Sequence, residues 1–308
     1  MTIVTVRVRD FLEMIRFSHT LFALPFALLG AFLAGTIPSS YGDFRAVTLA
    51  VRFGAVVLCM VSARSAAMAF NRLVDASVDA RNPRTSSRHL PSGRLTSSSV
   101  WIFFGASVLA FVLSCTLFWP NWLPLAGALP VLLWICGYSF AKRFTAAAHL
   151  WLGVALALSP VCAWIAVRGE QVMAHPSDVG PAIGLAAAIA CWVAGFDIIY
   201  ACQDADFDRS QGLHSVPAHV GIASALRIAA MAHAMMVVVL ASLPWLFPQL
   251  RLGLIYMVSL TVVGLLVVVQ HCLVRPNNLV RVNIAFFHVN AIISIGLSAV
   301  IALDAFLD

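Results

Sequence analysis

Residues 71–93, NRLVDASVDARNPRTSSRHLPSG, come after a long apolar run. They place two aspartates and four arginines in a chain that is 61% hydrophobic and only 10% charged. Asn71, Asp75 and Asp79 recur at intervals of four, so on an α-helix their side chains share one face. Carboxylate and amide oxygens in such a row suit Mg²⁺, which prefers oxygen ligands and keeps water and phosphate oxygens in its shell. Taken alone, the spacing also fits an ordinary polar loop between membrane spans.

A second stretch repeats this spacing. Residues 200–217, YACQDADFDRSQGLHSVP, contain Asp204 and Asp208, again four apart. The whole chain has only 13 Asp and Glu residues, so a second matched pair favours a functional site over two unrelated polar loops. Asp206 points to the other side of a helix from its two neighbours, which suits solvent as well as it suits a ligand.

The composition predicts a polytopic membrane protein. The mean hydropathy is +0.94, which no soluble domain of this length approaches. Nine apolar runs are each close to the ~20 residues that cross a hydrocarbon core, and backbone hydrogen bonding in lipid makes each of them a helix. The runs are residues 20–37, 46–69, 98–118, 122–140, 148–167, 180–201, 222–243, 252–272 and 283–303.

The predicted fold is therefore all-α, a nine-helix transmembrane bundle formed by a single domain over residues 1–308. Its halves, roughly 1–145 and 146–308, each contain a helix, an acidic stretch and a helix, which hints at two pseudo-repeats. The net charge of +6 fits contact with membrane lipid. No basic tract with interleaved aromatic residues indicates a nucleic-acid partner.

Charge asymmetry orients this bundle. With the N-terminus in the cytoplasm, 13 of the 19 Lys and Arg residues fall in cytoplasmic segments, against Arg45, Arg168 and Arg251 in outer loops. This bias is typical of a multi-pass protein of the cell membrane. Both acidic stretches then lie on the cytoplasmic side, where they can face one cavity. The cytoplasmic set is Arg7, Arg9, Arg16, Arg72, Arg81, Arg84, Arg88, Arg94, Lys142, Arg143, Arg209, Arg275 and Arg281.

Four carboxylates around one cavity repel one another unless cations lie between them. Two Mg²⁺ ions fit that charge, and a diphosphate supplies oxygens that bridge them. In an apolar bundle, the natural substrate is a diphosphate with a long apolar tail. Cleavage of its allylic carbon–oxygen bond leaves a carbocation for a nucleophile in a dry pocket. The basic residues placed to hold the phosphate oxygens are Arg72, Arg81, Arg84, Arg88, Lys142, Arg143 and Arg209.

These motifs carry a resemblance to a known family. The NxxxDxxxD row, the NPRT…LPSG continuation, YSFAKRFT at residues 138–145 and QDADFD between YA and GLHS resemble the UbiA family of intramembrane prenyltransferases. The family often carries an acid directly after the asparagine, where this chain has Arg72. The resemblance implies a Mg²⁺–diphosphate site formed by Asn71, Asp75, Asp79, Asp204 and Asp208.

Within that family, these sequence motifs are most similar to those of 4-hydroxybenzoate polyprenyltransferases and of relatives in the futalosine route to menaquinone. The resemblance therefore implies transfer of a polyprenyl group from polyprenyl diphosphate to an aromatic acid in ubiquinone or menaquinone biosynthesis. It leaves the choice between a 4-hydroxybenzoate and a dihydroxynaphthoate acceptor open.

Several single residues are further candidates. Asp197 lies in a predicted span, where an acid is a functional candidate by default, able to orient the acceptor or steady the cation. Tyr138 and Tyr200 lie near cytoplasmic span ends and could offer ring faces to a cation. Arg64 either reaches an acceptor carboxylate or snorkels toward the interface, and snorkelling is the simpler interpretation. His149 reads as a loop or packing histidine.

Two other functions compete with a transferase. A transporter of a divalent cation or an organic anion predicts polar groups along a path through the whole bundle, but here they gather on one side. An alcohol phosphotransferase also uses spaced aspartates in a membrane, but its DGxxAR opening is absent.

Overall fold

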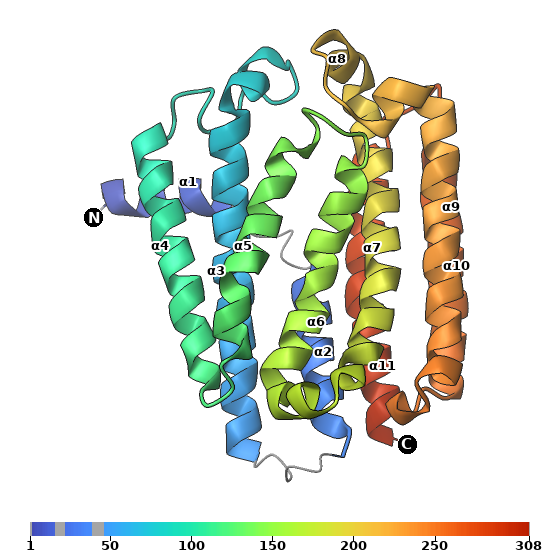
Figure 1. The fold of residues 1–308 in the computed structure, drawn as a ribbon. Helices are drawn as coiled ribbons and strands as arrows, with labels where there is room; N and C mark the ends of the chain where they lie inside the picture. The colour runs from blue at the N-terminus through green and yellow to red at the C-terminus, as the bar shows by residue number, and fades with distance from the viewer. Residues whose placement is uncertain (1, 16–21, 39–45, 308) are drawn as a thin grey trace.

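The computed structural model describes residues 2–15, 22–38 and 46–307, and they form a helical bundle (Figure 1). Within these ranges no β-strand is present beyond an isolated bridge between Arg275 and Asn278. The predicted all-α fold is confirmed. The helices are α1 Thr2–Met14, α2 Leu24–Thr36, α3 Ala46–Arg81, α4 Ser97–Cys115, η2 Thr116–Phe118, α5 Leu123–Ala141, α6 Ala148–Ala174, η3 Pro176–Val179, α7 Gly180–Ala201, η4 Cys202–Asp204, α8 Ala205–Ser210, α9 Val216–Leu246, η5 Pro248–Leu250, α10 Leu254–Leu273, η6 Ile284–Val289 and α11 Asn290–Leu307.

Each of the nine predicted spans corresponds to an apolar helix. In the described part of the chain, eight helices are long and apolar enough to cross a membrane, and α2 is a shorter apolar helix. The prediction began the first span at residue 20, whereas α2 begins at Leu24, and residues 16–21 lie outside the described part. Arg16 and Arg45 of the charge count also lie outside it, as does the side chain of Arg7.

Helix α3 is longer than a membrane requires. Its 36 residues correspond to about 54 Å at the α-helical rise, against a hydrocarbon core about 30 Å thick. The helix therefore continues past its apolar part, and Asn71, Asp75 and Asp79 occupy its last turns. Their shared face, predicted from spacing, follows from this unbroken helix.

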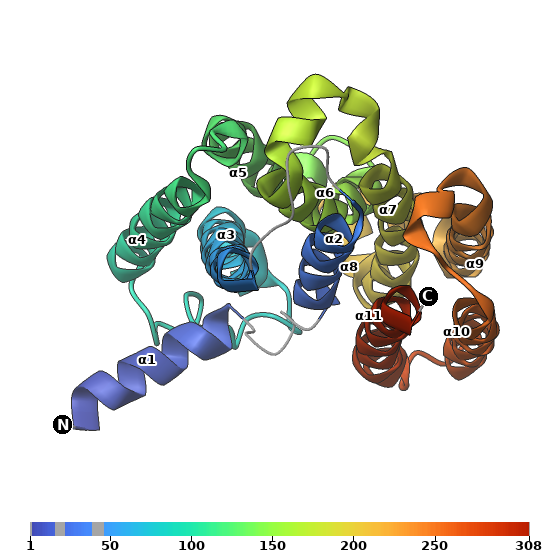
Figure 2. The same cartoon turned by 90° about the horizontal axis from the view of Figure 1, so that it is seen from below.

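The bundle has two sides joined by a central group of helices. Seen along the bundle in Figure 2, α3, α4 and α5 lie on one side, α9, α10 and α11 on the other, and α2, α6 and α7 between them. Glycine permits the close approaches within the central group. A Cβ atom on Gly30 of α2 would lie 2.7 Å from the carbonyl oxygen of Pro160 in α6, and one on Gly153 of α6 would clash with the carbonyl of Ala190 in α7.

The two acidic stretches lie at one end of the bundle. In Figure 1 the loop after α3 and the short helix α8 are both at the upper end, and the C-terminus is at the lower end. Helix α1 lies across the bundle rather than along it. The fold thus meets the geometric condition for a joint site of the two acidic stretches.

Candidate active site

A polar cavity of about 270 Å³ opens between the ends of α3, α5, α6 and α7. We call it the polar cavity. It brings together the predicted site residues except Arg81 and Arg209. Those lining it are Asn71, Arg72, Asp75, Asp79, Arg84, Arg88, Tyr138, Lys142, Arg143, Asp197, Tyr200, Asp204 and Asp208.

The first acidic row is held by its own helix and by the loop that follows. The Asn71 amide donates to Asp75 over 2.8 Å. Arg88 folds back so that its Nη1 lies 2.7 Å from both carboxylate oxygens of Asp79, and Arg72 lies 3.7 Å from the same group. Asp79 is only 6% exposed, so its ion pairs form in an environment where charge–charge interactions are strong.

The second acidic stretch starts where α7 changes geometry. The α-helix ends at Ala201, and a 3₁₀ turn over Cys202–Asp204 precedes α8. Arg84 reaches across from the loop after α3 and donates from Nε to Asp204 Oδ1 over 2.8 Å, while its Nη2 contacts Oδ2. The Asn82 amide donates to the same Oδ1 over 3.0 Å. The planar guanidinium fork therefore ties the two stretches together.

The electrostatics of Arg84 reflect this contact. Burial in itself lowers the pKa of the Arg84 guanidinium, but the hydrogen bond to Asp204 and the proximity of Tyr200 raise it above its ordinary value. Nη1 of Arg84 also donates to the Tyr200 hydroxyl over 2.9 Å. Arg84 is thus a permanent cation on the wall of the cavity.

Asp208 differs from the other three acids. It is 3% exposed, and its Oδ2 is buried without a hydrogen-bond partner among the described residues. Lys142 Nζ lies 3.6 Å from that oxygen, which is an ion pair but too long for a hydrogen bond. This orphaned carboxylate oxygen points to a ligand.

All four acids have basic neighbours, which changes one sequence-based expectation. Asp75 pairs with Arg143 at 3.6 Å, and the other three acids pair as described above. The prediction relied on divalent cations alone to separate the carboxylates. In the structure, arginine and lysine side chains already neutralise them, because the loop after α3 and the end of α5 fold over the cavity.

The donor set nevertheless fits Mg²⁺. Asn71, Asp75, Asp79, Asp204 and Asp208 offer only oxygen ligands around one cavity, together with amide and carboxylate groups already oriented by hydrogen bonds. Hard divalent cations take such oxygen sets, and Mg²⁺ keeps space for water and phosphate oxygens. The buried Oδ2 of Asp208, which has no hydrogen-bond partner among the described residues, is also suited to such a cation.

Two predicted residues lie outside the cavity. Arg81 is exposed at the end of α3 and does not line it. Arg209 pairs with Asp206 at 3.1 Å, and the side chain of Asp206 is 96% exposed. The helical turn of α8 directs these two side chains away from Asp208, so Asp206 takes the solvent position that its spacing allowed.

Asp197 lines the cavity and has a buried partner that sequence reasoning assigned to packing. His149 is 1% exposed, and its Nδ1 lies 2.7 Å from Asp197 Oδ2. The backbone N–H of Val216 donates to His149 Nε2 over 3.2 Å, so Nε2 carries no proton. The Nδ1–H of the neutral ring therefore donates to Asp197 and fixes the orientation of that carboxylate.

An aromatic wall adjoins Asp197. Phe22, Phe196, Tyr200 and Phe286 line the cavity, with the Tyr200 and Phe286 rings 4.3 Å apart and the Phe196 and Phe286 rings 5.4 Å apart. Phe286 belongs to η6, a π-helical turn, a geometry common at functional sites. Ring faces of this kind attract a cation.

A second, apolar chamber of about 200 Å³ continues from the polar cavity between α3, α4, α5 and α6. Its walls include Met60, Ala63 and Gly127. The residues that line both spaces are Arg64, Met68, Tyr138, Leu152 and Leu156. The polar cavity thus leads directly into an apolar one inside the bundle.

Roles for Asn82, His149 and the phenylalanines of the wall were not predicted from the sequence. Asn82 was part of the NPRT motif but received no role, although an asparagine followed by proline in a charged loop is a usable signal. His149 and Phe286 gave no local signal, because only tertiary packing brings them beside Asp197 and Tyr200.

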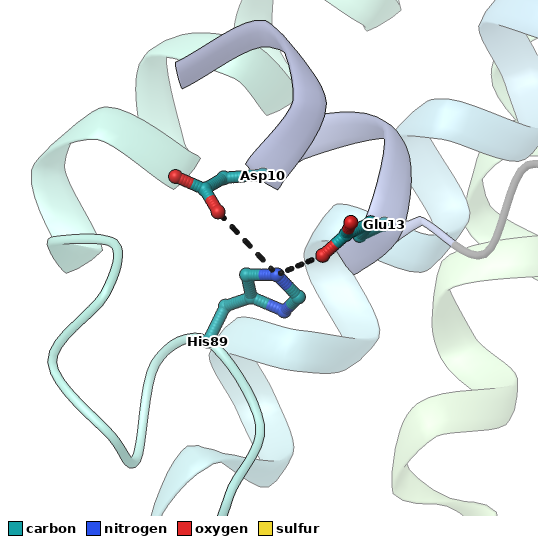
Figure 3. Close-up of side chains that lie close together, drawn as sticks. All are labelled: Asp10, Glu13 and His89. Atoms are coloured by element: carbon teal, nitrogen blue, oxygen red, sulfur yellow. Dashed lines mark ion pairs between the residues drawn. The ribbon is translucent and has the colours of Figure 1, made fainter. Parts of the chain in front are cut away.

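Helix α1 is attached near this site by a separate polar cluster. His89 Nε2 lies 3.7 Å from Glu13 and 4.0 Å from Asp10 (Figure 3). Burial, reinforced by Arg94, lowers the pKa of His89 despite these acids. The ligand atoms of the three residues lie within 4.8 Å of one another, a spacing that could hold a metal, but Arg9 already donates to Glu13 and none of the three lines the polar cavity.

This geometry has counterparts in known proteins. The model of the UbiA prenyltransferase family matches residues 23–292, which include both acidic stretches and most of the bundle. The chain belongs to the UbiA prenyltransferase family. It is therefore a multi-pass membrane prenyltransferase.

Individual relatives agree with this assignment. The chain is 32% identical to the 4-hydroxybenzoate octaprenyltransferase of Vibrio parahaemolyticus over 78% of this chain and 81% of that protein. It is 29% identical to the 4-hydroxybenzoate octaprenyltransferase of Xanthomonas euvesicatoria pv. vesicatoria over 78% of this chain and 76% of that protein.

Solved structures show the same fold. The apo structure of a UbiA homolog from Aeropyrum pernix K1 superposes with a TM-score of 0.75 at 28% identity and covers 94% of this chain and 98% of that one. A UbiA homolog from Archaeoglobus fulgidus, solved bound to GPP and Mg²⁺, superposes with a TM-score of 0.61 at 19% identity over 95% of this chain and 99% of that one.

Proposed function

We propose that this protein transfers a polyprenyl group from polyprenyl diphosphate to an aromatic acid, in a Mg²⁺-dependent step of ubiquinone or menaquinone biosynthesis. The observation that carries the proposal is the polar cavity itself. Two distant acidic stretches and their basic partners surround it, and it continues into an apolar chamber. The excess of basic residues at this end supports a cytoplasmic location for the site in the cell membrane.

The head of the substrate belongs in the polar cavity. Asn71, Asp75, Asp79, Asp204 and Asp208 would hold Mg²⁺, which when bound neutralises the charge that grows on a departing diphosphate. The arginines and Lys142 that now pair with the acids are within reach to turn toward phosphate oxygens. Arg84 and Arg88 offer planar forks, and Lys142 offers a point charge. Arg81 and Arg209 have no role in this arrangement.

The tail belongs in the apolar chamber. Cleavage breaks the bond between the allylic carbon and the diphosphate oxygen, and the bonding electron pair leaves with the diphosphate. The positive charge that remains on the allylic carbon faces the ring surfaces of Tyr138, Tyr200 and Phe286, which stabilise it. The apolar walls keep water from capturing the cation.

The acceptor completes the transfer. A ring carbon of the aromatic acid supplies an electron pair to the allylic carbon and forms the new carbon–carbon bond. The ring then loses the proton from that carbon and regains aromaticity. The Asp197 carboxylate, held in place by His149 at 2.7 Å, is the base on the cavity wall that accepts this proton.

Two further observations support this function. The relatives at about 30% identity are named for 4-hydroxybenzoate, an aromatic acid. The transporter alternative requires a polar path. Arg64 and Tyr138 line the apolar chamber where it is shared with the polar cavity, and its other described lining residues are apolar apart from Ser159.

Membranes that contain the protein are expected to transfer a radiolabelled polyprenyl group to an acceptor, and EDTA is expected to stop the reaction. Added Mg²⁺ should restore it, because chelation removes the cation that the acidic stretches hold. The measurement is label incorporation with 4-hydroxybenzoate, dihydroxynaphthoates and homogentisate in parallel. Membranes without the protein provide the control, and full transfer in the presence of EDTA would contradict the metal assignment.

A further inference from the structure

A cluster of potential metal ligands lies outside the polar cavity, between α1 and the loop after α3. Asp10 and Glu13 are three residues apart on α1, so their side chains share one face of that helix. His89 comes from the loop, and Figure 3 shows its ring directed between the two carboxylates. In the described part of the chain, this is the one set of three His, Cys, Asp or Glu side chains whose ligand atoms all lie within 4.8 Å of one another.

The imidazole of His89 gives an independent indication of a ligand. The residue is 8% exposed, and its Nε2 is buried without a hydrogen-bond partner among the described residues. The oxygens that face Nε2, Glu13 Oε2 and Asp10 Oδ1, are 3.7 and 4.0 Å away, which is too long for a hydrogen bond. Buried polar atoms normally have a partner, so Nε2 is placed for a group that binds between the ring and the two acids.

The separations fit a metal ion as that group. Nitrogen and oxygen ligands about 2.0–2.2 Å from a tetrahedral Zn²⁺ lie about 3.3–3.6 Å apart, so the three side chains need only a small movement to close on one ion. Arg9 does not compete, because its Nε donates to Oε1 of Glu13, whereas Oε2 faces His89. The Glu13 side chain is 43% exposed, which gives an ion access from solvent.

The ligand types select the kind of metal. The acids and amide of the polar cavity offer only oxygen, which suits Mg²⁺. The cluster at α1 adds an imidazole nitrogen, which suits borderline divalent transition ions such as Zn²⁺. Its two carboxylates match the charge of such an ion, and a water molecule can complete the coordination. The two sites should therefore take different ions.

We propose that Asp10, Glu13 and His89 form a second metal site, specific for a divalent ion of the zinc type, which fastens α1 to the loop after α3. The apolar side of α1 already packs against the bundle, with the Phe11 and Phe103 rings stacked at 4.9 Å. The ion adds a polar attachment on the other side of the helix. This inference does not depend on the proposed function, because ion binding requires no prenyl transfer.

The attachment acts next to the polar cavity. The residue before His89 is Arg88, whose guanidinium pairs with Asp79 at 2.7 Å. A metal ion on His89 would therefore hold the loop backbone directly beside a side chain of the candidate active site.

The test is equilibrium dialysis of the purified protein in nanodiscs against radioactive Zn²⁺, with Mg²⁺ in excess. The wild type is expected to bind one Zn²⁺ per chain at this site. His89→Gln and Asp10→Asn should each weaken that binding by at least about 100-fold, because loss of a ligand costs more than the roughly 10- to 100-fold that loss of an outer-shell partner costs. Circular dichroism and melting temperature check that each variant folds.

Two controls separate this site from other sites on the protein. Asp208→Asn changes the polar cavity but not the cluster, and His175→Gln removes an exposed histidine that belongs to neither. Both should bind Zn²⁺ like the wild type. Unchanged binding in folded His89→Gln or Asp10→Asn, or loss of binding in Asp208→Asn, would overturn the assignment.

Hydrogen exchange tests the attachment of α1. At a Zn²⁺ concentration about 100 times the Kd, the population in which α1 has detached should fall by about 100-fold. Exchange of the backbone amides of α1 should slow by a similar factor in the wild type, and stay unchanged in His89→Gln. If Zn²⁺ binds but the exchange of α1 is the same with and without it, the ion does not fasten the helix.

Discussion

Replacing Asp208 with asparagine is expected to lower kcat by about 1000-fold. The substitution keeps the shape of the side chain but removes the charge of a carboxylate that is 3% exposed and has an unpartnered oxygen in the polar cavity. A metal clamp contributes several kcal/mol to the stabilisation of a departing diphosphate, and each 1.36 kcal/mol corresponds to about tenfold in rate. Single-turnover transfer at saturating substrate gives the rate, and a Mg²⁺ titration should show weaker metal dependence on the same variant.

Asp206→Asn is the matched control for this result. It makes the same change of charge two residues away, but its side chain is 96% exposed and pairs with Arg209. We expect wild-type kcat. Circular dichroism and melting temperature check that both variants fold. A folded Asp208→Asn enzyme that turns over like the wild type would remove Asp208 from the metal site.

Replacing Ala63 with phenylalanine is expected to make the enzyme discriminate by chain length. Ala63 lines the apolar chamber but not the polar cavity, so the added ring takes up tail space and leaves the head site alone. Overfilling a packed apolar space costs about 1–3 kcal/mol, so kcat/KM with a long polyprenyl diphosphate should fall by about 10- to 100-fold. The kcat/KM with geranyl or dimethylallyl diphosphate should stay at the wild-type value.

The short substrates serve as the internal control, because they test the same head site in the same protein. Ala110→Phe adds an equal ring to an exposed position on α4 that lines neither cavity, and should leave both activities unchanged. An equal loss with short and long substrates in Ala63→Phe would show that the chamber does not hold the tail.

The sequence predicted the parts of this protein that depend on local pattern. Apolar length predicted the eight long helices of the described residues and the shorter α2, and spacing by four placed Asn71, Asp75 and Asp79 on one face. The number of predicted membrane crossings between the two acidic stretches was enough to predict that they lie at the same end of the bundle. The division into two pseudo-repeat halves stays a prediction.

The rest of the site depends on contacts between distant segments. Arg84 and Arg209 are both arginines beside an acidic motif, and only the path of the loop after α3 brings the first to Asp204. His149 lies on α6, 48 residues before Asp197, and no local pattern relates the two. From the sequence, Arg64 was more simply interpreted as snorkelling. In the structure it lines both the polar cavity and the apolar chamber.

Asp75, Asp79, Asp204 and Asp208 each pair with a basic side chain. The protein is therefore expected to bind a metal ion alone, or a diphosphate alone, only weakly. A bare metal ion would have to displace a guanidinium from Asp204 or Asp79, and a bare diphosphate would approach carboxylates. If the two bound together, the acids would hold the metal and the bases would hold the phosphate oxygens, so each group would keep a partner of opposite charge. Occupancy by one ligand should therefore tighten occupancy by the other, equally in both directions. By the same reciprocity, loss of either ligand would weaken the binding of the other, and the acids and bases would then pair again.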